Sequence, residues 1–358
     1  MASSSPVANN RLNENFQAVF SVQELIKEPT ISVPQSYVQS DQQSLHSASS
    51  PITLPIIDFK LLLSTDSELG KLHSTCKEWG IFQLVNHGVS PLLMENLKND
   101  IEEFYNLPLE EKMKYKIRPD SDVEGYGTAT RLRGKLDWGD RFYVVTNPIH
   151  RRKPHLLPEL PSSLRKNLES YILELQKLAK KLLGHIAEAL KIDEKEMEEL
   201  FDDGMQSIRM TYYPPCPQPE LVVGLTPHSD ATGITILNQV NGVDGLQIKK
   251  DGRWSPVTFF PDSLVVNIGD ILEILSNGIY NSIEHKVLVN SEKERVSVAF
   301  FVDPKFEAEV GPATSLINPN NQPMFKRVGM EQCFKDFFSR KLSGKSFVEH
   351  MKITGPGN

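Results

Sequence analysis

Two histidines and one aspartate of this chain are spaced so that they could hold a metal ion. His228 and Asp230 are separated by a single residue, and in an extended strand residues i and i+2 point to the same face. His285 could complete the set from a later strand. Two imidazoles and one carboxylate leave the opposite positions of an octahedron open, which is typical of non-heme Fe(II) sites that activate oxygen. The same three residues, the metal triad, also suit zinc, which would indicate a hydrolytic site.

An arginine and a serine downstream of His285 could bind a carboxylate. Arg295 and Ser297 share one face of an expected strand. A guanidinium binds a carboxylate through two parallel hydrogen bonds, and a neighbouring hydroxyl adds a third. The pair therefore predicts a receptor for a dicarboxylate whose other end reaches the metal. Alternatively, Arg295 pairs with a surface acid such as Glu292 or Glu294. The zinc interpretation leaves this pair without a role.

The composition indicates a chain with a substantial core and no attraction to polyanions. Of its 358 residues 39% are hydrophobic, the net charge is −7 and the isoelectric point is about 5.8. This balance does not attract nucleic acid or an anionic membrane surface, and no apolar run approaches the ~20 residues of a membrane span. The N-terminus lacks the features of a secretory signal, and three cysteines without C-x-x-C spacing indicate reduced thiols. We therefore expect a cytoplasmic monomer that binds neither nucleic acid nor membranes.

The first half of the chain is expected to supply helices around a core. Residues 1–50, rich in Ser, Gln and Asn, predict a loose N-terminal arm. Apolar residues at helical spacing predict helices at residues 22–26, 67–79, 93–104 and 162–192. The last of these should back a sheet with its apolar stripe. Residues 117–148, with glycines and aromatic residues, predict a long loop of the kind that forms binding surfaces. Residues 51–205 would thus be a helix-rich part that packs on the core.

From residue 206 onward the pattern changes to short strands separated by turns. Strands are expected at residues 208–213, 234–238, 246–250, 264–268, 283–289 and 296–303. Consecutive short strands favour a sandwich or jelly roll over a parallel βαβ sheet. We expect residues 206–310 to form this catalytic core, with the metal triad inside its mouth. Residues 311–358 would form a C-terminal helical segment with a helix at 330–342, and all parts would belong to one integrated domain.

Several short motifs agree with one family. They are LPIID at 54–58, WGIFQLVNHG at 79–88, YYPPCP at 212–217 and VNIGD at 266–270. With the metal triad, Arg295 and Ser297, they make the chain resemble the plant 2-oxoglutarate/Fe(II)-dependent dioxygenases over about residues 50–345. It is most similar to the senescence-related-gene-like branch, which includes codeine and thebaine O-demethylases. Anthocyanidin and flavonol synthases are more distant. The resemblance implies an α+β fold with a mainly β core, a double-stranded β-helix (jelly roll) flanked by helices.

The resemblance also implies a role for each candidate residue. The metal triad would hold Fe(II), with 2-oxoglutarate and O2 as cosubstrates and ascorbate as reductant. Arg295, Ser297 and Tyr213 would bind the far carboxylate of 2-oxoglutarate. The reaction would be hydroxylation or O-demethylation of a small aromatic plant metabolite such as an alkaloid or flavonoid, with release of succinate and CO2. The family commonly has Asn two residues before Tyr213, where this chain has the shorter Thr211.

Four aromatic residues are candidates for the substrate pocket: Tyr126, Phe142, Tyr143 and Phe301. The first three belong to the expected loop, which in the family helps to wall the pocket. By alternation from Ser297, Phe301 and Ala299 should face the pocket and Phe300 should face away. Each of the four aromatics could instead pack in the core. The motifs leave the substrate open, and they also leave open a catalytically silent small-molecule-binding module on the same fold.

Overall fold

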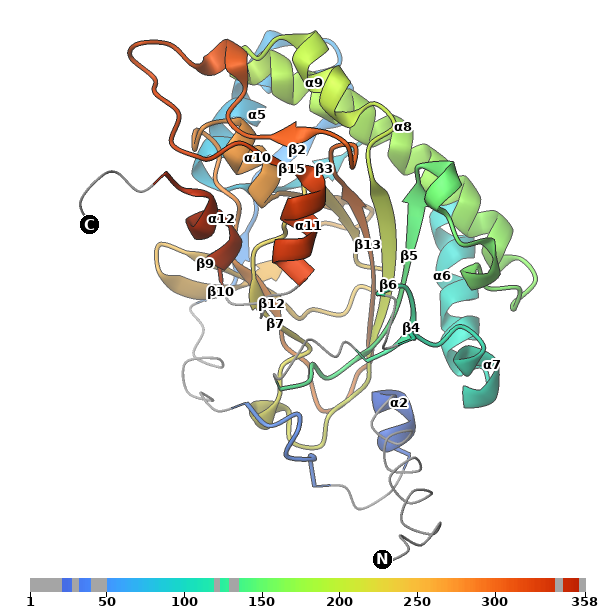
Figure 1. Cartoon of the computed structure of the whole chain (residues 1–358). Coiled ribbons are helices and arrows are strands. Elements are labelled where there is room, and N and C mark those ends of the chain that lie inside the picture. The colour runs from blue at the N-terminus through green and yellow to red at the C-terminus, as the bar shows by residue number, and fades with distance from the viewer. Residues whose placement is uncertain are drawn as a thin grey trace, which may run out of the picture.

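Two β-sheets that face each other form the centre of the molecule (Figure 1). The structure is a computed structural model and describes residues 21–27, 32–39, 50–118, 123–128, 135–338 and 344–353. The larger sheet has the strand order β2 (Ile56–Asp58), β3 (Ile81–Val85), β11 (Leu264–Ile268), β8 (Ile234–Asn238), β13 (Arg295–Val302), β6 (Gln206–Tyr213), β5 (Asp140–Asn147) and β4 (Gly125–Gly127). The smaller sheet has the order β1 (Ile52–Thr53), β10 (Arg253–Thr258), β9 (Leu246–Lys250), β12 (His285–Val287) and β7 (Leu225–His228). Only the β1–β10 and β2–β3 pairs are parallel among these described strands. The expected jelly roll with flanking helices is confirmed.

The two faces of the larger sheet bury different side chains, because successive residues of a strand point to opposite sides. Val265 of β11 packs in one apolar cluster with Ile248 of the smaller sheet. We call this side of the larger sheet its inner face. Val266, Met210 and Phe300 belong instead to the main core on the other side, the outer face. The outer face therefore contributes to the main apolar core, and the inner face faces the smaller sheet.

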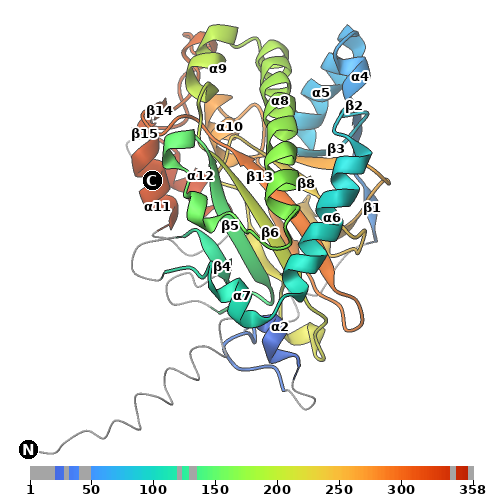
Figure 2. The same ribbon diagram turned by 90° about the vertical axis from the view of Figure 1, so that its right-hand side faces the viewer.

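Helices cover the outer face. The longest, α8 (Leu164–Leu190), crosses it together with α6 (Pro91–Asn106) (Figure 2). The predicted apolar stripe of α8 is buried at every position: Leu168, Tyr171, Leu175, Leu178, Leu182 and Ile186. The prediction that this helix backs the sheet is therefore confirmed.

Shorter elements complete the chain. The other helices are α2 (Val22–Leu25), α4 (Phe59–Leu62), α5 (Asp66–Glu78), α7 (Leu109–Met113), α9 (Glu194–Phe201), α10 (Asp270–Leu275), α11 (Met330–Phe338) and α12 (Ser346–Met351). Single turns of 3-10 helix lie at Ile149–Arg151, Pro154–Leu156, Pro219–Leu221 and Thr314–Leu316. A small separate hairpin pairs β14 (Glu309–Val310) with β15 (Val328–Gly329).

The described part of the expected loose arm is packed against the sheet. Asp140 of β5 is fully buried and accepts hydrogen bonds from the Val22 N–H at 2.6 Å and the Tyr126 hydroxyl at 2.9 Å. The Ser21 hydroxyl and the Gln23 N–H donate to the same carboxylate. Free N–H groups at a helix start need such acceptors, so Asp140 fastens α2 to the sheet.

Residues 117–148 are not the single long loop predicted from the sequence. β4 and β5 pair with each other at the edge of the larger sheet, and β5 pairs along its length with β6. Residues 119–122 and 129–134 of this segment lie outside the described residues. At the C-terminus, α11 begins at Met330 as predicted, residues 339–343 are not described, and α12 was not predicted.

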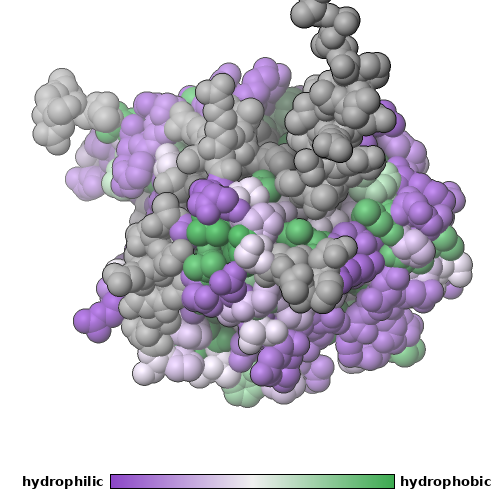
Figure 3. Space-filling view, turned by 90° about the horizontal axis from the view of Figure 1, so that it is seen from below, coloured by the Kyte–Doolittle hydropathy of each residue, from purple (hydrophilic) through white to green (hydrophobic). Residues whose placement is uncertain are grey.

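Figure 3 shows the end of the molecule below the view of Figure 1, where small apolar patches lie between polar residues on the area that is not grey. Among the described residues, no helix has both the length and the apolar character that crossing a bilayer requires.

Candidate metal centre and cosubstrate pocket

The metal triad comes together on the smaller sheet. β12 pairs antiparallel with β7 so that His285 lies directly opposite His228, and Asp230 follows two residues after His228. The three side chains are buried, and one potential ligand atom from each lies within 4.8 Å of the others. Among the described residues, this is the one such group of histidine, cysteine and acidic side chains. The three predicted ligands therefore lie close enough together to hold one metal ion.

Backbone carbonyls orient both imidazoles. The Nδ1 of His228 lies 2.8 Å from the Thr226 carbonyl oxygen, and the Nδ1 of His285 lies 3.1 Å from the Ile283 carbonyl oxygen. Nδ1–H donation to these carbonyls leaves each Nε2 with a free lone pair. The two Nε2 atoms lie 3.4 Å and 3.7 Å from the same Oδ1 of Asp230. Three donor atoms that converge in this way fit a divalent transition metal, and the mixed nitrogen and oxygen set suits Fe(II).

The protonation states also fit a metal site. Burial lowers the pKa of His285 to about 4, although the Asp230 charge opposes this. Burial opposes ionisation of Asp230, but the two imidazoles and the Thr235 hydroxyl outweigh it and hold the pKa of Asp230 well below its usual range. The Thr235 hydroxyl donates to Asp230 at 2.8 Å, and the Asn267 amide lies 3.3 Å from the same oxygen. A neutral imidazole and an ionised carboxylate are the forms that bind metals.

A buried cation lies on the inner face of the neighbouring sheet. Arg295 is 2% exposed. It donates to the Ser297 hydroxyl at 3.3 Å and to the Gln239 side-chain carbonyl at 3.0 Å. Its Nε has no hydrogen-bond partner, and its guanidinium lies 5.2 Å from the ring centroid of Tyr213. A buried cation is costly without an anion, so the arrangement favours a carboxylate ligand at this point.

The alternative pairing of Arg295 with a surface acid is not found. No carboxylate in the described part of the chain lies within 4.0 Å of its guanidinium. Glu294 instead accepts a hydrogen bond of 2.6 Å from the Tyr212 hydroxyl. β6 and β13 pair so that Tyr213 lies opposite Arg295 and Thr211 opposite Ser297. The geometry thus brings Tyr213, Arg295 and Ser297 together.

One cavity joins two members of the metal triad, Asp230 and His285, to this cation. Its lining includes Asp230, His285, Tyr213, Arg295 and Ser297, and its apolar wall includes Leu225, Leu237, Leu246, Val287, Ala299 and Phe301. The predicted alternation along β13 is confirmed, because Ala299 and Phe301 line the cavity and Phe300 is in the outer core. A dicarboxylate bound at Arg295 would therefore point toward the metal position along this apolar wall.

The four aromatic candidates divide between the two faces. Tyr143 lies on the inner face, with its ring centroid 6.4 Å from that of Phe301. Phe142 pairs with Met210 and Tyr126 pairs with Phe142, so both point to the outer face, where they are buried in the main core. The expectation that Tyr126 and Phe142 wall the substrate pocket is therefore wrong, because strand alternation in β4 and β5 turns them toward the helices.

Sequence reasoning missed three residues of the site. Arg209 lines the cavity, and its alternation with Thr211 and Tyr213 along β6 could have found it. Thr235 and Asn267 contact the carboxylate of Asp230. Their positions depend on the pairing of β8 with β11 and β13, which no local pattern in the sequence reveals.

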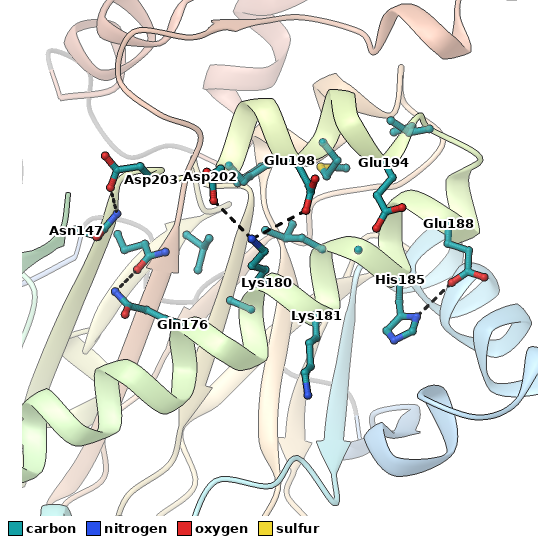
Figure 4. Close-up of a pocket in the computed structure, with 18 residues that line it drawn as sticks. Asn147, Gln176, Lys180, Lys181, His185, Glu188, Glu194, Glu198, Asp202 and Asp203 are labelled. Carbon is teal, nitrogen blue, oxygen red and sulfur yellow. Dashed lines mark hydrogen bonds and ion pairs between the residues drawn. The ribbon is translucent and has the colours of Figure 1, made fainter. Parts of the chain in front are cut away.

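A larger hollow of about 980 Å³ lies between α8 and α9 (Figure 4). The ionisable side chains at its rim are largely paired with each other. Lys180 Nζ lies 3.6 Å from Asp202 Oδ1, and His185 Nδ1 lies 3.3 Å from Glu188 Oε2. No residue of the metal triad lines it. We therefore assign the chemistry to the smaller cavity between the sheets.

Comparison with known proteins agrees with this geometry. Residues 204–304 match the 2OG-Fe(II) oxygenase superfamily, and residues 54–161 match the non-haem dioxygenase in morphine synthesis N-terminal family. The chain is 50% identical to oxoglutarate-dependent flavonoid 7-O-demethylase 1 of Ocimum basilicum over 339 residues. This match covers 93% of this chain and 90% of that protein. It is 48% identical over 351 residues to codeine O-demethylase of Papaver somniferum, covering 95% and 97%.

A solved structure gives the same result. The structure of JOX2 in complex with 2OG, Fe and JA superposes with a TM-score of 0.87 at 35% identity, covering 93% of this chain and 98% of that one. The resemblance predicted from the motifs is confirmed.

Proposed function

Because the chain belongs to the 2OG-Fe(II) oxygenase superfamily, we propose that it oxidises a C–H bond of a small oxygenated aromatic plant metabolite, by hydroxylation or O-demethylation. The enzyme is a 2-oxoglutarate-dependent dioxygenase that uses Fe(II). The observation that carries the proposal is the cavity that Asp230 and His285 of the metal triad share with Arg295 and Phe301. Two similar proteins are named for O-demethylation of flavonoids and of codeine, which supports an aromatic ether as substrate.

Each residue has a defined task in this proposal. His228, Asp230 and His285 would hold Fe(II), which with 2-oxoglutarate and O2 supplies the oxidising power for C–H cleavage while succinate and CO2 are released. Arg295 and Ser297, with Tyr213 alongside, would fix the far carboxylate of 2-oxoglutarate through charge-assisted hydrogen bonds. These contacts orient the cosubstrate and neutralise the buried cation. The zinc-hydrolase interpretation is set aside, because it gives no role to this receptor.

The apolar wall would place the substrate. Leu225, Leu237 and Leu246 line the cavity beside Phe301, and they exclude water from the reacting C–H bond. Positioning of this kind is the main contribution of a protein to chemistry that its cofactor performs. If the oxidised carbon is an O-methyl group, the hydroxylated product collapses to formaldehyde and a free hydroxyl group. We propose Phe301 and Tyr143 as substrate contacts.

The first test is an anaerobic titration of metal-free protein with Fe(II) and 2-oxoglutarate, monitoring the weak visible absorption band of a chelated keto acid. We expect the band in the wild type, and succinate with formaldehyde or a hydroxylated product once O2 and a panel of methoxylated phenols and alkaloids are added. The competing candidate, a silent binding module on the same fold, predicts substrate binding without any C–H oxidation product. Absence of the band despite bound iron would reject the proposed function.

The physical state and location of the protein belong to the same proposal. We propose a cytoplasmic monomer, as the composition predicts. Size-exclusion chromatography with light scattering and fractionation of plant cells test the two parts separately, and a dimer or an organelle-bound pool would contradict them.

A further inference from the structure

Residues 344–353, near the end of the chain, lie beside the segments that carry the metal triad. α12 of this part packs next to α10 (Figure 1), and its Phe347 and Val348 are buried in the main core. The two residues before α12, Gly344 and Lys345, contact the segments that flank the metal ligands. Neither of them lines the cavity that contains the cosubstrate receptor. These two residues therefore approach the metal site from outside that cavity.

Gly344 bonds to the backbone on both sides of His228. Its N–H donates to the Pro227 carbonyl at 3.3 Å, and its carbonyl accepts from the Ser229 N–H at 3.2 Å. The two bonds make a parallel β-bridge between Gly344 and His228, at the edge of the smaller sheet that β7 forms. Gly344 has a φ of +50°, which L side chains rarely adopt. The C-terminal segment therefore fixes the backbone of the first metal ligand.

Lys345 supplies the positive charge for a buried carboxylate of α10. The Glu273 side chain is 7% exposed, and its Oε2 lies 2.5 Å from Lys345 Nζ. Within the described ranges, Lys345 is the one basic residue with a nitrogen within 4.0 Å of this carboxylate. The same Oε2 accepts hydrogen bonds from the Ser282 N–H at 2.6 Å and from the Ser282 hydroxyl at 2.9 Å. A buried carboxylate needs both hydrogen bonds and a counter-charge, and Lys345 provides the counter-charge.

The contacts of Glu273 lead directly to the second histidine of the metal triad. Ser282 is followed by Ile283, whose carbonyl oxygen lies 3.1 Å from the Nδ1 of His285. This carbonyl selects the tautomer and the orientation of the imidazole. Without the cation, a buried carboxylate would take up a proton or turn toward water, and either change would weaken its hold on the Ser282 N–H. The ion pair of Lys345 therefore acts on His285 through three consecutive contacts.

The alternative is that this ion pair only fastens α12 to the rest of the protein. Two observations favour a role at the metal site. The apolar residues of α12 already hold it in the main core, and both hydrogen bonds that Glu273 accepts come from Ser282 and none from α12. We propose, on the premise of the proposed function, that Lys345 is a positioning residue of the metal site, which neutralises Glu273 and so keeps His285 in the orientation that binds the metal.

Binding of Co(II) to metal-free protein tests this role without turnover, substrate or 2-oxoglutarate. Co(II) is the probe because its visible absorption reports the geometry of its ligands. The variants are Lys345→Met, Lys345→Arg, Glu273→Gln and the double variant Lys345→Met/Glu273→Gln. Lys352→Met is the matched control, because it removes an ion pair with Glu349 at an exposed position of the same segment. Thermal melts without metal show whether each variant is folded.

We expect Lys345→Met to bind Co(II) about ten- to hundredfold more weakly than the wild type, which is the usual effect of removing an outer partner of a metal ligand, and to change the visible spectrum. Lys345→Arg restores the charge and should bind within a few fold of the wild type, as should Lys352→Met. Glutamine at position 273 is neutral and still accepts from Ser282, so the double variant should bind within a few fold of Glu273→Gln alone.

Unchanged Co(II) affinity and spectrum in Lys345→Met would overturn the inference, even with a lower melting temperature, because Lys345 would then only fasten α12. A tenfold loss from Glu273→Gln to the double variant would also overturn it, since Lys345 would not act through Glu273. If Lys345→Met does not fold, that second comparison decides. A different result rejects the proposed function: a wild type that does not bind Co(II), or Asp230→Ala that binds it as tightly as the wild type, would show that the metal triad is not a metal site.

Discussion

Replacing Arg295 with lysine separates cosubstrate binding from the rest of the reaction. The guanidinium uses one nitrogen for Ser297 and another for Gln239 and keeps its Nε unpartnered. Lysine retains the charge but loses the planar fork that holds a carboxylate with two parallel bonds. Loss of one charge-assisted hydrogen bond costs about 1.5–3 kcal/mol, which corresponds to a roughly ten- to hundredfold weaker affinity for 2-oxoglutarate.

The assay follows succinate formation against 2-oxoglutarate concentration at saturating iron and substrate. In Arg295→Lys we expect the KM for 2-oxoglutarate to rise by that factor, while kcat at saturation stays within a few fold of the wild type. Arg253→Lys, at an exposed position of β10, is the matched control and should not change the KM. A KM within twofold of the wild type, or a loss of kcat that excess cosubstrate does not relieve, would refute the assignment of Arg295.

Four further predictions follow from the structure. Asp230→Ala should abolish iron retention and succinate formation, measured by metal analysis and product assay, and normal turnover would rule out the triad. Phe300→Ala should lower the free energy of unfolding by about 3–5 kcal/mol, because it leaves a cavity in the core on the outer face. Phe301→Ala should mainly change substrate affinity. Denaturant titration and binding assays that show the reverse would contradict the faces assigned to these two side chains. Asp140→Ala should destabilise the fold by at least about 2 kcal/mol, because buried donors of α2 and β4 lose their acceptor, and an unchanged melting temperature would contradict this role. Asp303 has a raised pKa, so its folded form binds more protons and its contribution to stability is lost as pH rises above the ordinary value of 3.8; Asp303→Asn lacks this loss, and its melting temperature relative to wild type should increase with pH.

Much of the site could be predicted because it depends on strand alternation. The i, i+2 relation placed His228 with Asp230, and the same relation along β13 correctly separated Ala299 and Phe301 from Phe300. Apolar periodicity likewise found α8 and its buried stripe. These features depend on neighbours in sequence, so a local pattern is sufficient to detect them.

The errors came from contacts between distant strands. β5 contains arginine, threonine and asparagine among its eight residues, and its strand structure depends on pairing with β6. Without that partner the segment was interpreted as loop, and Tyr126 and Phe142 were wrongly assigned to the pocket. The contacts of Asn267 and Thr235 with Asp230 likewise depend on sheet order, which local sequence does not encode.

The two-sided character of β13 has a consequence for how this enzyme can change over evolutionary time. β13 pairs on both edges, with β6 and with β8. Inserting one residue into β13 would turn the side chains of its inner face to the outer face and those of its outer face to the inner face, so its length cannot change. Substitutions at Ala299 or Phe301 leave the outer core untouched. Substitutions at a few residues of the inner face can therefore change the substrate range while the fold keeps its stability. Related enzymes that keep the same β13 strand can in this way act on different substrates.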